Sequence, residues 1–192
     1  MGNLINNGLY TSATEEWETP PAFFEAINAE YNFTLDPACT EENHKCPKFY
    51  TKKEDGLQQD WGGERVYINP PYGRQIVKWI EKAEAEAKKP DTLCVLLLPA
   101  RTDTAWFHDH IAKNAKIYFI RGRLRFNGSN SNAPFPSMLA VYDNRVSRLT
   151  GWSTTLESGI SLGDTPEERA RTLKTIFGNK CPFCGSEREF DT

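Results

Sequence analysis

VYINPPY, residues 66–72, joins an apolar, β-branched run to two consecutive prolines. The run Val66-Tyr67-Ile68 is typical of the end of a buried strand. The prolines end that strand because neither can donate a hydrogen bond to a sheet ladder, and each holds the preceding residue extended. The stretch predicts a stiff loop of Asn69, Pro70, Pro71 and Tyr72 at the carboxyl end of a strand, which is where ligands bind in open α/β sheets.

The groups in this loop suit a planar exocyclic amine. The side-chain oxygen of Asn69 and the carbonyl of Pro70 can each accept a hydrogen bond from an –NH2 group. The ring of Tyr72 can stack on the base that carries the amine. We therefore predict that the loop activates an adenine amine for methyl transfer. The alternative is a strand-terminating turn without chemistry.

Strands and helices alternate on either side of the loop. Thr19-Pro20 predicts a helix N-cap followed by a first-turn proline. Further helices are expected over residues 76–87 and 104–113, and further strands over residues 33–35, 93–98, 117–120 and 138–142. This order predicts the α/β class, with helices on both faces of a mostly parallel sheet. The last two strands are expected to form an antiparallel edge.

Length and composition indicate one main domain. The chain has 192 residues, of which 39% are hydrophobic, enough for a single sizeable core. The longest apolar run, residues 93–98, is far too short to span a membrane. The N-terminus lacks a signal-peptide pattern. Five cysteines without such a pattern predict a reducing, cytoplasmic location.

Positive charge is concentrated in the second half of the chain, although the whole chain carries a formal charge of −3. Residues 100–150 contain eight Lys or Arg and three acidic residues. Arg121, Arg123 and Arg125 alternate within this segment, so on a strand they would share one face and could follow nucleic-acid phosphates. The alternative is a solvated strand edge, where charge deters aggregation.

Four motifs occur in the order found in DNA methyltransferases that act on amino groups. They are Trp17-Glu18-Thr19-Pro20-Pro21, Asp36-Pro37-Ala38-Cys39, Asp55-Gly56-Leu57 and Asn69-Pro70-Pro71-Tyr72. Together with residues 98–104, LPARTDT, they make the chain resemble the phage-type DNA adenine methyltransferase (Dam-like) family over roughly residues 15–145. The resemblance implies a Rossmann-like methyltransferase fold, S-adenosylmethionine as methyl donor and adenine in DNA as acceptor.

The resemblance also implies positions for the donor. Asp36-Pro37-Ala38 would lie near its methionine part, Asp55 would accept from its adenine amine, and Thr19-Pro20 would lie near its carboxylate, where a helix N-terminus favours an anion. Ordinary turns and a plain helix cap are the alternatives. This chain departs from the family pattern because no Gly-x-Gly follows Asp36. Glu41 and Glu42 are candidates for the ribose by position only.

The C-terminal part carries a separate motif. Cys181 and Cys184 supply half of the four ligands that a closed structural zinc site requires. Cys39, His44, Cys46 or a second subunit would have to complete such a site. A free thiol pair or a redox motif is the alternative. A capping box at residues 165–168 predicts a helix before these cysteines.

These observations predict a flexible tail over residues 1–16, a methyltransferase domain over 17–150, and a C-terminal helix with a possible zinc extension over 151–192. The expected function is site-specific methylation of adenine in double-stranded DNA, with the base flipped out of the stack, in the cytoplasm of a phage-infected or prophage-carrying bacterium, where it would protect DNA from restriction. Alternatives are methylation of a cytosine amine, RNA or a protein glutamine, and an inactive DNA-binding module, which the missing Gly-x-Gly motivates. The oligomeric state stays open.

Overall fold

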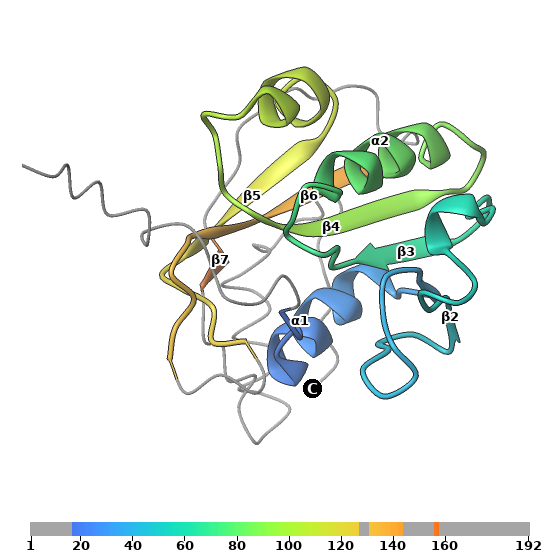
Figure 1. Cartoon of the computed structure of the whole chain (residues 1–192), viewed down its shortest axis with the longest axis horizontal. Coiled ribbons are helices and arrows are strands. Elements are labelled where there is room, and N and C mark those ends of the chain that lie inside the picture. Colours follow the sequence, from blue (N-terminus) through green and yellow to red (C-terminus); the bar gives the residue numbers. More distant parts are fainter. Residues whose placement is uncertain (1–16, 127–130, 144–155, 158–192) are drawn as a thin grey trace, which may run out of the picture.

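A sheet of seven strands forms the centre of the computed structural model, which describes residues 17–126, 131–143 and 156–157 (Figure 1). The order across the sheet is β2-β1-β3-β4-β6-β5-β7. The strands are β1 (Leu35–Asp36), β2 (Lys48–Phe49), β3 (Arg65–Ile68), β4 (Leu93–Pro99), β5 (Lys116–Arg121), β6 (Ser137–Asp143) and β7 (Leu156–Glu157). Four of these six neighbouring pairs are parallel. The predicted α/β class with a mostly parallel sheet is confirmed.

The last two predicted strands pair antiparallel as expected, and the two-residue strand β7 lies outside them in the sheet. β6 lies between β4 and β5 and is antiparallel to both. Its pairing with β4 is continuous, from Leu93 opposite Asp143 to Pro99 opposite Ser137. β4 is buried along its whole length, and β6 is buried except at Asp143. Two such apolar strands stabilise each other best as central neighbours, because both faces of each are covered.

Helices cover both faces of the sheet (Figure 1). The helix α1 (Pro21–Tyr31) packs against the face that carries Tyr67 and Val95. The helix α2 (Ile76–Glu86) and the π-helix η3 (Phe107–Ile111) pack against the opposite face, which carries Ile68 and Leu96. Neighbouring residues of one strand point to opposite faces, so each central strand contributes to both hydrophobic clusters.

The start of α1 differs from the prediction. Pro20 occupies the N-cap position and Pro21 begins the helix, with no side-chain cap hydrogen bond. The first helical bond runs from Phe24 N to Pro20 O at 3.0 Å. The predicted N-cap, Thr19, points instead into the protein, where it is 2% exposed. The reason is a buried partner: its hydroxyl lies 2.6 Å from the hydroxyl of Tyr67 on β3.

Two shorter features complete the described part. A single 3₁₀ turn, η2 (Gly56–Gln58), precedes β3. The helix expected over residues 104–113 is the π-helix η3, in which Ala112 N donates to Phe107 O, five residues earlier, at 2.8 Å. Within the described ranges, no helix has the length and apolar character that a membrane span requires.

Candidate active site

A cavity of about 570 Å³ opens at the carboxyl ends of β1 and β3. This volume lies within the range of roughly 300–1,000 Å³ that is usual for small-molecule and cofactor sites. β1 and β3 are parallel neighbours, so the loops that follow them meet at one edge of the sheet. Most of the predicted site residues line this cavity: Thr19, Asp36, Pro37, Ala38, Asp55, Asn69, Pro70 and Pro71.

Asn69 directly follows β3, and the Nδ2 group of its side-chain amide donates two hydrogen bonds. Its Nδ2 group donates to the backbone carbonyl of Trp17 and, at 3.0 Å, to Oγ1 of Thr19. Its Oδ1 atom is buried and accepts no hydrogen bond from the residues that the structure describes. A buried acceptor without a donor typically costs about 1–3 kcal/mol. Within the described part of the chain, Oδ1 of Asn69 is thus a buried acceptor whose hydrogen-bonding capacity is unused.

Tyr72 is the last residue of the loop and does not line the cavity, and neither does Pro20. Its hydroxyl donates to the carbonyl of Leu97 on β4 at 3.2 Å. Its ring is 5.5 Å from Phe135 and 6.3 Å from Phe126 between centroids, both edge to face. Trp17 packs against the same two rings at 5.3 and 5.2 Å. We call Trp17, Tyr72, Phe126 and Phe135 the aromatic cluster. It joins three parts of the chain that are distant in the sequence, around residues 17, 72 and 126–135.

Asp36 closes the other side of the cavity at the end of β1. Its carboxylate accepts from the backbone N–H groups of Lys45 at 3.0 Å and Ala38 at 3.3 Å. Burial raises the pKa of Asp36 from 3.8 to about 6, and those two hydrogen bonds oppose part of the shift. Asp36 therefore holds the loop over residues 37–45 in place without any glycine, in the region where the family pattern has Gly-x-Gly.

Asp55 is exposed at the rim of the cavity and has a left-handed backbone, with φ 51°. Its Oδ1 atom accepts a hydrogen bond from Leu57 N at 3.2 Å, and the residue lines the cavity. The next residue, Gly56, allows a close approach between two loops. A Cβ atom on Gly56 would lie 2.1 Å from the carbonyl oxygen of Pro37. The absence of a side chain at Gly56 thus allows this loop to pack closely against the loop after Asp36.

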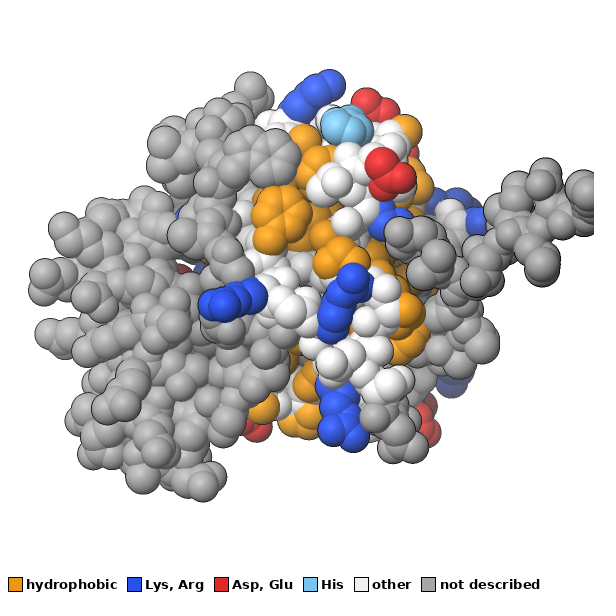
Figure 2. Space-filling view, turned by 90° about the vertical axis from the view of Figure 1, so that its left-hand side faces the viewer, with side chains coloured by type: hydrophobic (Ala, Val, Ile, Leu, Met, Phe, Trp, Pro, Cys, Tyr) orange, Lys and Arg blue, Asp and Glu red, His pale blue; other side chains and the backbone are white. Residues whose placement is uncertain are grey.

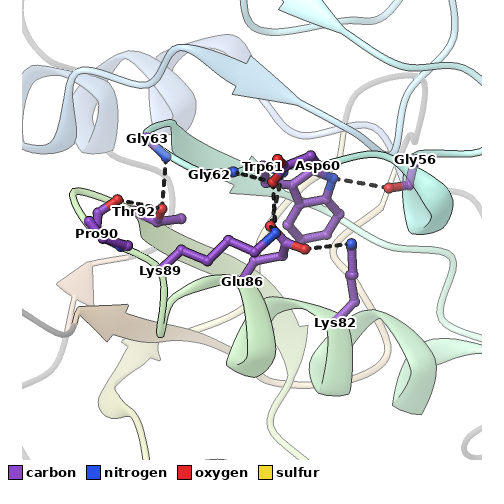
Figure 3. Close-up of polar contacts among 10 residues, drawn as sticks. All are labelled: Gly56, Asp60, Trp61, Gly62, Gly63, Lys82, Glu86, Lys89, Pro90 and Thr92. Atoms are coloured by element: carbon purple, nitrogen blue, oxygen red, sulfur yellow. Dashed lines mark hydrogen bonds and ion pairs between the residues drawn. The ribbon is translucent and has the colours of Figure 1, made fainter.

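A buried network holds the loop that carries Asp55 and Gly56 against α2 (Figure 3). The indole N–H of Trp61 donates to Gly56 O at 3.0 Å, and Trp61 N donates to Oε2 of Glu86 at 2.9 Å. The carboxylate of Glu86 also accepts from Lys82 at 2.6 Å and Lys89 at 2.7 Å. Burial disfavours the charge on Glu86, yet these bonds outweigh it and leave its pKa below the usual value.

Sequence reasoning missed the charged groups at the rim of the cavity. Lys45 forms an ion pair with Glu18 at 3.2 Å, and both residues line the cavity together with Lys52. Sequence motifs carry no signal for this pair, because its members lie 27 positions apart. Glu41 and Glu42, the positional candidates for the ribose, are exposed and do not line the cavity.

The three predicted DNA-binding arginines do not share a strand. β5 ends at Arg121, and Gly122 turns the chain with a φ of 79°. Arg121, Arg123 and Arg125 are nevertheless all exposed, while the intervening Leu124 and Phe126 are buried. Exposed and buried side chains therefore alternate even though this segment is not a strand, because Leu124 and Phe126 pack into the core. Phe126 belongs to the aromatic cluster, so the arginines lie next in sequence to a ring that contacts Tyr72.

The cysteines divide between the described and the remaining residues. Cys181 and Cys184 lie outside the described residues, as does the predicted helix before them. Cys39 and Cys46 are buried, and burial raises the pKa of each thiol to about 12. In the part of the chain that the structure describes, no group of three His, Cys, Asp or Glu side chains is arranged to hold a metal ion.

Comparison with known proteins gives a consistent result. The model of the family described as DNA N-6-adenine-methyltransferase (Dam) matches residues 8–145. The DNA N-6-adenine-methyltransferase of Escherichia phage T1 is 34% identical over 110 residues, which cover 56% of this chain and 45% of the phage protein. "Putative methyltransferase YfdM" of Escherichia coli (strain K12) is 35% identical over 66 residues, which cover 30% of this chain and 71% of that protein. The chain thus spans less than half the length of the phage relative. The family match includes every residue that lines the cavity.

Proposed function

Because the chain belongs to the DNA N-6-adenine-methyltransferase (Dam) family, we propose that it transfers a methyl group from S-adenosylmethionine to the exocyclic amine of adenine at specific sites in double-stranded DNA. The observation that carries this proposal is the buried Oδ1 atom of Asn69, an acceptor without a donor among the described residues, in a residue that lines a cavity of cofactor size. An exocyclic amine is the donor that the atom lacks.

The target amine would be held by the loop after β3. Asn69 Oδ1 and the carbonyl of Pro70 would each accept one of its two protons. These hydrogen bonds draw the nitrogen away from planarity and make its lone pair available, and they stabilise the positive charge that develops on the amine. Tyr72 would support the base from behind through its ring, which the bond from its hydroxyl to Leu97 O holds in place. No separate general base is required, because the proton can leave after methyl transfer.

The cavity suits S-adenosylmethionine in size and in the chemistry of its lining. When bound, this donor supplies an electrophilic methyl group. Asp55 would accept from its adenine amine, and the flanking Leu57 and Trp79 offer apolar contact to the base. The loop over residues 36–38 would border its methionine part. The residues before α1 would receive its carboxylate, since a helix N-terminus favours an anion. This assignment corresponds to a Rossmann-like methyltransferase fold, in which ligands bind beyond the carboxyl ends of parallel strands.

DNA would approach the side that carries the arginine segment. Arg121, Arg123 and Arg125 are exposed and would contact phosphates. Figure 2 views the described part from the left of Figure 1, and Lys and Arg side chains stand out along that face. The target adenine would have to leave the base stack, because its amine is unreachable inside the duplex.

The test is methylation of unmethylated plasmid DNA by the purified protein, followed by long-read mapping of modified bases. We expect methyl groups on adenine within one short sequence context, and none with Asn69→Ala. Methyl groups on cytosine, RNA or a protein glutamine under the same conditions would replace adenine as the substrate. Titration calorimetry with S-adenosylmethionine distinguishes an enzyme from an inactive DNA-binding module. A protein that binds DNA but does not bind the donor would be such a module.

A further inference from the structure

The orientation of the Asn69 side chain is determined by its surroundings. The backbone carbonyl of Trp17 can only accept a hydrogen bond, so the end of the amide that faces it must be Nδ2. The opposite orientation would bring Oδ1 against this carbonyl, with two acceptors in contact. The second partner of Nδ2 is Oγ1 of Thr19 at 3.0 Å. Both partners belong to the segment just before α1.

Thr19 is itself held by a residue of β3, the strand that Asn69 follows. Tyr67 lies two positions before Asn69 and belongs to the hydrophobic cluster on the face of the sheet that α1 covers. The hydroxyls of Thr19 and Tyr67 lie 2.6 Å apart, and their residues are 2% and 1% exposed. Burial raises the pKa of Tyr67 well above its usual range, so the phenol keeps its proton. The pair is thus a neutral, buried hydrogen bond that fixes the position of Oγ1.

We propose that Thr19, anchored by Tyr67, is a positioning residue that holds the Asn69 amide with Oδ1 free for the target amine. This role rests on the proposed function and differs from the one that the family resemblance implies for Thr19, near the carboxylate of the donor. A hydroxyl offers two acceptor lone pairs and one proton, and here one lone pair serves Asn69 while the bond to Tyr67 uses the proton or the second lone pair. If Thr19 positions Asn69, its loss lowers the rate of methyl transfer. If it binds the donor, its loss lowers donor affinity.

Substitutions at Thr19 and Tyr67 separate these roles. We expect Thr19→Val to lower kcat about tenfold, the effect of one lost hydrogen bond, with the Kd for S-adenosylmethionine unchanged. Thr19→Ser keeps the hydroxyl and should restore kcat, and Tyr67→Phe should lower kcat by a smaller factor. Thr92→Val and Tyr142→Phe are matched controls: both side chains are buried, and their hydroxyls bond to Pro90 O and His110 O, away from the cavity.

A second readout does not depend on activity. In protein labelled with ¹⁵N-asparagine, the side-chain amide signals of Asn69 are identified by their absence in Asn69→Ala. Thr19→Val should shift one of the two amide protons upfield and speed its exchange with water, while Thr92→Val leaves both unchanged. Unchanged Asn69 signals in Thr19→Val, or a loss of donor affinity as large as the loss of kcat, would overturn the positioning role. A wild-type protein that does not methylate DNA would overturn the proposed function instead, and the amide signals would still report on the contact.

Discussion

The single atom on which the proposed chemistry depends is Oδ1 of Asn69. Its amide has both Nδ2 contacts satisfied by the segment before α1, and its oxygen is buried without a donor among the described residues. A folded protein normally pairs such an acceptor, and in the proposed function the target amine would supply the missing donor. Asp36 is also unusual, because its carboxylate is buried and accepts hydrogen bonds from the backbone N–H groups of Ala38 and Lys45.

Replacing Asn69 by Ala should abolish most of the methyl transfer and leave binding of S-adenosylmethionine largely intact. One lost transition-state acceptor is expected to lower kcat by roughly 10²–10³-fold. The measurement is single-turnover methylation together with calorimetric donor binding. Asn114→Ala is the control, since that amide contacts Glu84 on the opposite face of the sheet. A variant that keeps more than about a tenth of the wild-type kcat would contradict the role of Asn69.

Asp36 predicts a dependence of stability on pH. Its pKa is about 6 in the folded protein and 3.8 in the unfolded chain, so between these values the folded state binds the proton more tightly. The free energy of unfolding contributed by Asp36 therefore rises as the pH falls from 6 toward 4, by up to about 3 kcal/mol at roughly 1.4 kcal/mol per pKa unit. Urea unfolding of the wild type and Asp36→Asn at several pH values tests this. If the free energy of unfolding changes with pH in the same way for the wild type and for Asp36→Asn between pH 4 and pH 6.5, the pKa of Asp36 is not raised by folding.

At the level of elements, the cavity is formed by loops that stabilise one another. The loop after β1 meets the loop around Gly56, where there is no room for a side chain. Trp61 holds the carbonyl of Gly56, and Glu86 on α2 holds the backbone of Trp61 (Figure 3). A helix on one face of the sheet thus determines the position of a loop at the cavity rim. Removing one partner from such a buried ionic network is usually more costly than its net contribution to stability, because the others lose their compensation.

Gly56→Ala should disturb this contact and weaken donor binding. The added Cβ would lie 2.1 Å from Pro37 O, a backbone atom, and overpacking of this kind typically costs about 1–3 kcal/mol. Thermal unfolding and donor titration are the measurements. Gly62→Ala is the matched control, because its Cβ would first meet the exposed side chain of Asp60 at 3.2 Å, which can move aside. If both substitutions change the melting temperature and the donor affinity equally, the close contact between the loop around Gly56 and the loop after β1 is not required for donor binding.

On the scale of the whole molecule, the sheet order brings distant segments together. The long pairing between β4 and β6 carries the chain from the arginine segment back to the centre of the sheet. Phe126 and Phe135 then contact Trp17 and Tyr72. The proposed DNA-binding segment and the proposed catalytic loop are therefore joined through the aromatic cluster, so DNA bound along the arginines would lie close to the loop.

Neutralising Arg121, Arg123 and Arg125 together by substitution with Gln should weaken DNA binding and reduce its dependence on salt. Each lost phosphate contact lowers the slope of log K against log salt concentration by about 0.9. Fluorescence anisotropy with a labelled duplex at several salt concentrations gives this slope. The control replaces three exposed lysines, Lys78, Lys88 and Lys113, with Gln, which changes the net charge equally. If both triple variants change the slope of log K against log salt concentration by the same amount, the three arginines affect DNA binding through net charge and do not contact phosphates directly.

Much of the fold and the core of the candidate site could be predicted from local sequence. Local sequence patterns predict several of these features, because each depends on residues that are neighbours in the chain. They are the apolar runs of β3, β4 and β6, the amphipathic helix α2 and the two prolines after Asn69. The strand-end position of the Asn69 loop is also legible locally, because ligands bind beyond the carboxyl ends of parallel strands, and in the structure Asp36 and Asn69 both line one cavity.

Only the tertiary structure decided the rest. The central position of β6, the contact of Gly56 with Pro37, the ion pair of Lys45 with Glu18 and the burial of Thr19 against Tyr67 all join residues far apart in the chain. Such contacts depend on which elements pack together, and a local pattern carries no signal for that choice. Thr19 is the clearest example, because its position before a proline-led helix predicts a cap. A buried hydroxyl partner on β3 instead turned its side chain inward, since burial favours a paired hydroxyl.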